Sequence, residues 1–147
     1  MQNLQFPRYS FKIKSTENNY YIFDVIRKKY IMLTPEEWVR QHVVHYLIYA
    51  KSYPISYINV EKAFTINGLT KRYDVVVFNS DGSIHLLVEC KKPEVAISQE
   101  VFDQIARYNL KLNANFLMVT NGLQHIYSKL DFEKQRYEFL SDIPLNR

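Results

Sequence analysis

The segment at residues 86–93 reads LLVECKKP and joins an apolar run to two residues that could do chemistry. Glu89 follows three apolar residues directly, and Lys91 stands two positions later. Side chains two positions apart on a strand point to the same face, so this carboxylate and this ammonium group would lie together. Such a pair suits phosphodiester hydrolysis, in which a metal ion acidifies water and a positive charge stabilises the transition state. A solvated strand end that merely carries charges is the alternative interpretation.

A second carboxylate, Asp74, is brought to Glu89 by the preceding hairpin. If Asp81 and Gly82 centre a two-residue turn, antiparallel register opposes Asp74 to Glu89, and it also pairs Asn79 with Ile84, Val77 with Leu86 and Val75 with Val88. A three-residue loop with a bulge would shift this register by one residue. Opposed carboxylates, with Cβ atoms roughly 5 Å apart, repel each other, and a divalent cation, which prefers oxygen ligands, removes the conflict. We therefore predict that Asp74 and Glu89 bind Mg²⁺ or Mn²⁺.

Helix and turn signals give the elements that must position these residues. Thr34 as N-cap, Pro35 in the first turn and Glu37 three residues after the cap predict a helix over 35–51. Apolar residues at helical spacing predict a second helix over 98–112. Predicted strands cover 9–14, 20–27, 57–66, 71–79, 84–91, 116–120 and 123–129. The predicted order is ββ–α–βββ–α–ββ, and the tail after residue 130 is ambiguous.

Length, composition and charge limit the classes of protein to which this chain can belong. The chain has 147 residues, the length of one domain, and its 47% hydrophobic content is enough for a core. No apolar run reaches the roughly 18 residues of a membrane span, and the N-terminus lacks the apolar region of a secretory signal. With a single cysteine, which excludes an internal disulfide, a cytoplasmic protein is expected. The net charge of +4 permits an anionic partner such as nucleic acid without requiring one.

Four segments of the sequence resemble the PD-(D/E)XK nuclease superfamily and, more closely, the nuclease domain at the N-terminus of type I restriction enzyme R subunits. They are KRYDVVVF (71–78), LLVECKKP (86–93), QIARY (104–108) and VTNG (119–122). The resemblance covers roughly residues 34–128. An E-x-K motif alone is weak evidence, whereas an Asp, E-x-K and Q-x-x-x-Y on successive elements are far more specific.

The resemblance implies a mixed α/β fold with a restriction-endonuclease-like αβββαβ core, which agrees with the order of the predicted elements. We expect one nuclease-like domain over residues 1–147. It would consist of an N-terminal β-hairpin extension (1–33), a nuclease core (34–130) and a C-terminal tail (131–147). Basic residues of the hairpin could form a groove for an anion or an ordinary solvated face: Lys12, Lys14, Arg27, Lys28 and Lys29.

The resemblance also implies roles for the residues of the hairpin that carry the motif. Asp74 and Glu89 would bind the metal together with the backbone carbonyl of Cys90. Lys91 would activate or orient the attacking water. The Cys90 side chain points away from Glu89 and is expected to pack as a small apolar residue.

Further residues are expected to tune the site or to contact substrate. Gln104 and Tyr108 match the Q-x-x-x-Y motif, with Gln104 bonding a phosphate or water and Tyr108 supporting it; a solvated Gln104 beside a core Tyr108 is the alternative. Glu37 matches an acidic residue that these enzymes often add to the site, although it could equally complete a capping box. Arg72, which the register places opposite Lys91, and Lys92 are expected to contact substrate, but Arg72 could also be an ordinary surface residue.

The predicted function is Mg²⁺-dependent hydrolysis of DNA by an endonuclease, which the resemblance implies would leave a 5′-phosphate and a 3′-hydroxyl. The alternative is a catalytically weak or inactive nuclease-like module that binds nucleic acid or a partner protein. The expected partners are DNA and a separate helicase or specificity subunit, with a homodimer also compatible and no membrane involved. The residues leave open whether the substrate is DNA or RNA.

Overall fold

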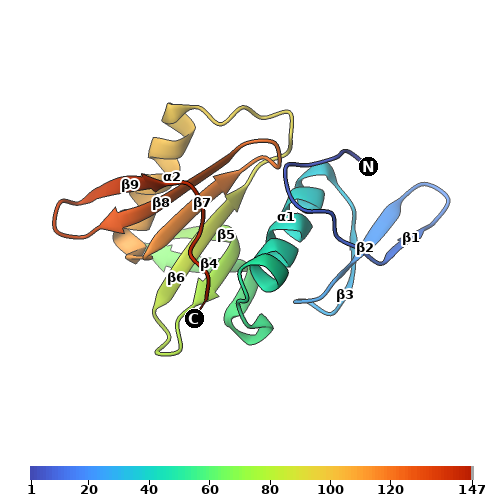
Figure 1. Cartoon of the computed structure of the whole chain (residues 1–147), viewed down its shortest axis with the longest axis horizontal. Helices are drawn as coiled ribbons and strands as arrows, with labels where there is room; N and C mark the ends of the chain where they lie inside the picture. The colour runs from blue at the N-terminus through green and yellow to red at the C-terminus, as the bar shows by residue number, and fades with distance from the viewer. Residues whose placement is uncertain (147) are drawn as a thin grey trace.

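The structure is a computed structural model that describes residues 1–146, and within them the chain forms two sheets and two α-helices (Figure 1). The strands are β1 (Ile13–Ser15), β2 (Tyr20–Asp24), β3 (Lys29–Met32), β4 (Ile58–Ile66), β5 (Leu69–Phe78), β6 (Ile84–Cys90), β7 (Phe116–Thr120), β8 (His125–Asp131) and β9 (Arg136–Leu140). The helices are α1 (Pro35–His45), which continues as a π-helical turn (Tyr46–Ala50), a short 3₁₀ turn (Ile55–Tyr57) and α2 (Gln99–Leu112).

The larger sheet has the strand order β4-β5-β6-β7-β8-β9. Neighbouring strands are antiparallel except β6 and β7, which are parallel. A parallel pair requires a crossover connection, and α2 provides it. α1 covers one face of the sheet and α2 the other (Figure 1). The order α1-β4-β5-β6-α2-β7 confirms the predicted mixed α/β fold with its αβββαβ core.

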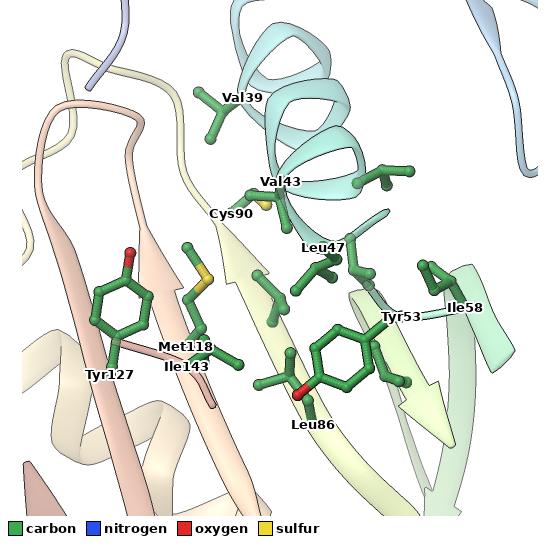
Figure 2. Packing of buried hydrophobic residues seen from close by; sticks show 14 residues of the cluster. Val39, Val43, Leu47, Tyr53, Ile58, Leu86, Cys90, Met118, Tyr127 and Ile143 are labelled. Carbon is green, nitrogen blue, oxygen red and sulfur yellow. The ribbon is translucent and has the colours of Figure 1, made fainter. Parts of the chain in front are cut away.

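Both faces of β6 are buried over residues 86–90, in agreement with the apolar run at 86–88. Leu86 and Val88 pack in the cluster on the α1 side, and Leu87 packs in the cluster on the α2 side. Cys90 ends the strand among apolar side chains of the α1 side, as predicted (Figure 2). Glu89, between Val88 and Cys90, is therefore directed toward α2.

The N-terminal extension is a three-stranded sheet rather than the predicted hairpin, with the order β1-β2-β3. The prediction read residues 20–27 as one strand, but the chain turns after Asp24. The Asp24 carboxylate accepts hydrogen bonds from the backbone N–H groups of Ile26 and Arg27, at 2.7 and 2.8 Å, and Lys28 has φ +57°. An Asp that bonds the backbone two residues later closes a turn, and this turn creates β3.

Other boundaries also differ from the predictions. The first strand forms only at Ile13–Ser15, and the helix predicted over 35–51 is α-helical only to His45. The ambiguous tail contains β9, which pairs with β8. Within residues 1–146, none of the helices is both long and apolar enough to cross a lipid bilayer.

Candidate active site

The two predicted metal ligands stand where β5 and β6 separate. The ladder between these strands ends at the pair Val75–Val88; beyond it, β5 continues beside β4, and β6 continues beside β7 as far as Cys90. Asp74 and Glu89 are the next residues of the two strands, so their predicted ladder pairing is not made. Instead, the Cys90 N–H donates a hydrogen bond of 2.7 Å to Asp74 Oδ2. The Asp74 carboxylate is thereby fixed beside the residue that follows Glu89.

The predicted hairpin register is confirmed next to the site and wrong at the turn. Ile84 pairs with Phe78 rather than with Asn79, because a bulge lies between Val77 and Phe78. The bulge is on the turn side of the hairpin, so both predicted pairs toward the site are formed: Val77–Leu86 and Val75–Val88.

β5 changes the face that its side chains occupy at Asp74. Alternation from Val75, which packs on the α1 side, would put Tyr73 on that side too, yet Tyr73 packs in the α2-side cluster. On the neighbouring strand β4, the residue at the level of Asp74 is Glu61, which lies between the pairs Val60–Val75 and Lys62–Tyr73. Glu61 is not a glycine, yet it has φ +55°. Such a φ is uncommon outside glycine. This local twist lets Asp74 reach α1 while Tyr73 remains beside α2.

On the α1 side, Arg40 holds the Asp74 carboxylate. Its Nη2 lies 2.6 Å from Asp74 Oδ1, and its Nη1 donates to Glu37 Oε1. Burial alone lowers the pKa of Arg40, but the hydrogen bond and charge of Asp74 and the charge of Glu37 raise it above its ordinary value. A charged guanidinium therefore lies between the two acids. Sequence reasoning missed Arg40, although its position three residues after Glu37 on a helix face was a usable signal.

Thr34 caps α1, and Glu37 takes part in this cap only through its backbone N–H. Its N–H donates to Thr34 Oγ1 at 3.1 Å, as predicted, whereas its carboxylate is occupied by arginines rather than returning to the cap. Arg27, from the turn after β2, contacts Glu37 Oε2 at 2.9 Å and Glu61 Oε2 at 3.2 Å. Arg27 thereby fastens the N-terminal sheet to the acidic residues around Asp74.

Acid is expected to weaken this attachment through Asp24. Burial on its own raises the pKa of Asp24, but the hydrogen bonds and charge of Arg27 lower it below its ordinary value. A carboxyl whose folded-state pKa is depressed stabilises the fold above its unfolded pKa, near 3.9 for Asp, and this stabilisation is lost as pH falls through the folded-state value. We expect Asp24→Asn to cost about 1.5–3 kcal/mol at pH 7. Thermal unfolding should also show a smaller loss of stability below about pH 4 in this variant than in wild type; parallel losses would contradict this role.

On the α2 side, Glu89 lies in a pocket of about 230 Å³ with Lys91, Gln104 and Tyr108. Its Oε1 lies 3.3 Å from Lys71 Nζ, and its buried Oε2 has no hydrogen-bond partner among residues 1–146. Burial, followed by the charge of Asp74, raises the pKa of Glu89 to about 7 against the opposing charges of Lys71 and Lys91. The structure therefore brings four of the predicted residues into one pocket, and Asp74 adjoins it through Cys90 rather than lining it.

The two predicted substrate-contacting cations lie outside this pocket. Arg72 pairs with Ala63 of β4 and is exposed, because β5 has already left β6 and cannot place it opposite Lys91. Lys92 is exposed in the turn after β6. Lys71 enters the pocket instead, and its ammonium lies 5.4 Å from the centroid of the Tyr73 ring. Lys71 takes the place predicted for Arg72 because β5 changes face at Asp74. No pattern in the sequence indicated this change.

The donor atoms at the site fit a hard divalent cation. Within the described residues 1–146, no group of three or more His, Cys, Asp and Glu side chains is arranged to hold a metal. The predicted donors, two carboxylates and the Cys90 carbonyl, are of the kind that suits Mg²⁺, because this ion usually keeps several waters and takes one or two carboxylates. The buried Oε2 of Glu89, which accepts no hydrogen bond from the part of the chain that the structure describes, is an acceptor for such an ion. Each Asp74 oxygen, although hydrogen-bonded, retains a second lone pair.

Comparison with known proteins gives one family and one fold. The family described as "Type I restriction enzyme R protein N terminus (HSDR_N)" has a model that matches residues 35–144. A solved fragment assigned to the HsdR subunit of a type I restriction enzyme from Vibrio vulnificus YJ016 superposes with a TM-score of 0.54 at 23% identity, over 77% of this chain and 24% of that chain. Comparison with curated proteins gives no match. The structural likeness shows the same fold, and residues 1–34 lie outside the family match.

Proposed function

Since this chain belongs to the family of the type I restriction enzyme R protein N terminus, we propose that it is a nuclease domain that hydrolyses DNA phosphodiester bonds with Mg²⁺ or Mn²⁺. One observation carries the proposal. Glu89, Lys91, Gln104 and Tyr108 line a single pocket, and Asp74 is hydrogen-bonded to the backbone directly beside it. A carboxylate, an amine and a polar side chain around one hollow, with a second carboxylate beside it, are groups that phosphodiester hydrolysis can use.

In this mechanism, Asp74, Glu89 and the carbonyl of Cys90 would hold the cation, which would supply Lewis acidity and neutralise charge on the phosphate. Lys91 orients the attacking water or offsets the negative charge that develops in the transition state. Gln104, exposed at the edge of the pocket, bonds a phosphate oxygen, and Tyr108 supports its side chain from one helical turn away. In-line attack leaves a 5′-phosphate and a 3′-hydroxyl.

The arginines on the α1 side position the site without touching substrate. Arg40 fixes one oxygen of Asp74 and the Cys90 N–H fixes the other, so the carboxylate is held in a defined orientation. Glu37 acts through Arg40, because its two oxygens are taken by Arg40, Arg27 and Gln41. This assigns Glu37 a positioning role in place of direct metal binding.

A second candidate function is a nuclease-like module that binds nucleic acid or a partner protein and cuts weakly or not at all. The contact between Arg40 and Asp74 favours it, since a guanidinium already neutralises this carboxylate. In both cases DNA is the proposed ligand, and a separate helicase or specificity subunit is the proposed protein partner. A homodimer would supply the second site needed to cut both strands.

Plasmid and single-stranded DNA incubated with Mg²⁺ or Mn²⁺ distinguish the two functions. Wild type should cleave, and Lys91→Ala should reduce the rate by at least about a hundredfold, as expected for a lost electrostatic contact in the transition state. Lys111→Ala removes an exposed lysine near the end of α2 and should leave the rate unchanged. DNA binding without cleavage in wild type would support the module, and equal cleavage by wild type and Lys91→Ala would refute the proposed role of the site.

A further inference from the structure

The positive charge of the chain is concentrated in its N-terminal extension. Six of the 19 Lys and Arg residues and two of the 15 Asp and Glu residues lie in residues 1–33, which gives this segment the full net charge of +4. The remaining residues contain 13 of each kind and are neutral overall. The charged segment lies outside the family match and forms the small sheet that stands apart from the larger one (Figure 1).

The strand register sorts the side chains of this sheet onto two faces. Ile22 is fully buried and pairs with Ile13 and Ile31, and Asp24, two residues later, bonds Gln41 of α1. This inner face is the one packed on the body of the protein. The outer face carries two rows of side chains: Lys14, Tyr21 and Met32 in one, and Lys12, Phe23 and Tyr30 in the other.

The outer face combines ammonium groups with aromatic rings. Lys14 Nζ lies 4.2 Å from the centroid of the Tyr30 ring, and Lys12 Nζ lies 5.6 Å from that of Phe23. The Phe23 and Tyr30 rings are 5.3 Å apart. Tyr30 is 38% exposed and Met32 is 47% exposed, so apolar surface remains open to solvent beside the lysines.

We propose that this outer face binds single-stranded nucleic acid. Exposed aromatic side chains on a sheet stack unpaired bases, and neighbouring lysines neutralise phosphates. A duplex hides its bases and could not use the rings. Three strands about 4.8 Å apart span roughly 10 Å, enough for two or three nucleotides.

The position of the sheet links this surface to the site. Arg27 joins the turn after β2 to Glu37 and Glu61, and both acids contact Arg40, which binds Asp74. Single-stranded nucleic acid bound on the outer face would therefore be connected, through the turn that carries Arg27, to α1. Arg40 of this helix orients Asp74, the proposed metal ligand. The inference rests on the proposed function at one point only: the bound single-stranded nucleic acid is taken to be DNA rather than RNA.

Fluorescence anisotropy with a labelled 15-nucleotide oligo(dT), measured in EDTA, tests the surface without any cleavage. Tyr30→Leu should weaken binding about tenfold, the loss expected for one stacked base. The pair Lys12→Gln and Lys14→Gln should flatten the slope of log K against log salt by about 1.4, because two phosphate contacts are lost. The matched control, Lys111→Gln with Lys134→Gln, removes the same charge from exposed positions elsewhere and should bind like wild type.

Three results would overturn the inference: unchanged binding by both outer-face variants, equal weakening by the control pair, or tighter binding of a 15-base-pair duplex than of the single strand. An oligo(U) RNA of the same length tests whether the surface prefers single-stranded RNA or single-stranded DNA. Tighter RNA binding would keep the surface and exclude DNA as its ligand. Circular dichroism verifies folding, and the two exposed lysines provide a test even if Tyr30→Leu fails to fold. Because this binding is measured in EDTA and cleavage is measured separately with Mg²⁺, failure of the surface and failure of the proposed cleavage remain distinguishable.

Discussion

Replacing Arg40 with leucine is expected to destabilise the protein by about 3–5 kcal/mol, the cost typical of removing one partner from a buried ion pair. Arg40 is 7% exposed, and its guanidinium bridges Asp74 and Glu37, which are also buried. Without it, the Asp74 carboxylate keeps, among residues 1–146, only the Cys90 N–H as a hydrogen-bond partner. Urea unfolding at pH 7.5 in EDTA measures the loss.

Arg107→Leu provides the matched control, because Arg107 is exposed on α2; its expected effect is within about 0.5 kcal/mol. Adding Mn²⁺ should restore part of the stability of Arg40→Leu, since the proposed cation at Asp74 would replace the missing positive charge. A loss below about 1 kcal/mol would contradict the stabilising role given to Arg40, and no effect of Mn²⁺ would contradict the proposed cation at Asp74.

Glu89→Gln is expected to separate activity from stability. Cleavage should fall by at least about a hundredfold, because the variant would lack one of the two proposed charged ligands for the cation. The fold should be as stable as wild type or more so, since the wild-type carboxylate is buried, close to the charge of Asp74 and only weakly paired with Lys71. Initial cleavage rates and urea unfolding in EDTA measure the two effects.

Glu94→Gln, at an exposed position in the loop after β6, is the control and should change neither quantity. If Glu89→Gln instead unfolds the protein while leaving cleavage per folded molecule intact, Glu89 is a structural residue and the proposed site is wrong.

The sequence disclosed the parts of the site that depend on local pattern. Glu89 and Lys91 are two positions apart on an apolar strand, and the Asp-Gly turn places Val75 against Val88, so the approach of Asp74 to the end of β6 could be predicted. The motif on α2 places Gln104 and Tyr108 on one helical face, and both line the pocket.

The sequence did not disclose the features that depend on tertiary geometry. The change of face at Asp74 requires Glu61 to adopt a positive φ on the neighbouring strand, and nothing in the residues of β4 indicates this. For that reason Lys71, rather than Arg72, reaches the pocket. Arg40 and Glu61 come together from α1 and β4, which are distant from each other in sequence.

The missed strands have a different cause. β3 follows a turn that Asp24 closes through its side chain. Because apolar residues flank this turn, the sequence pattern does not show that the strand ends there. β9 is an edge strand with mostly exposed residues, and it therefore lacks the apolar alternation that marks a buried strand.

Isothermal titration of Mn²⁺ into metal-free protein tests most directly whether Asp74 and Glu89 hold a cation together. Wild type should bind one Mn²⁺ per chain, and Asp74→Asn should weaken this binding by at least about tenfold, as a lost ligand charge implies. Asp103→Asn, which changes an exposed acid on α2, should bind Mn²⁺ like wild type. Equal affinity and stoichiometry in wild type and folded Asp74→Asn would show that the cation is not held there.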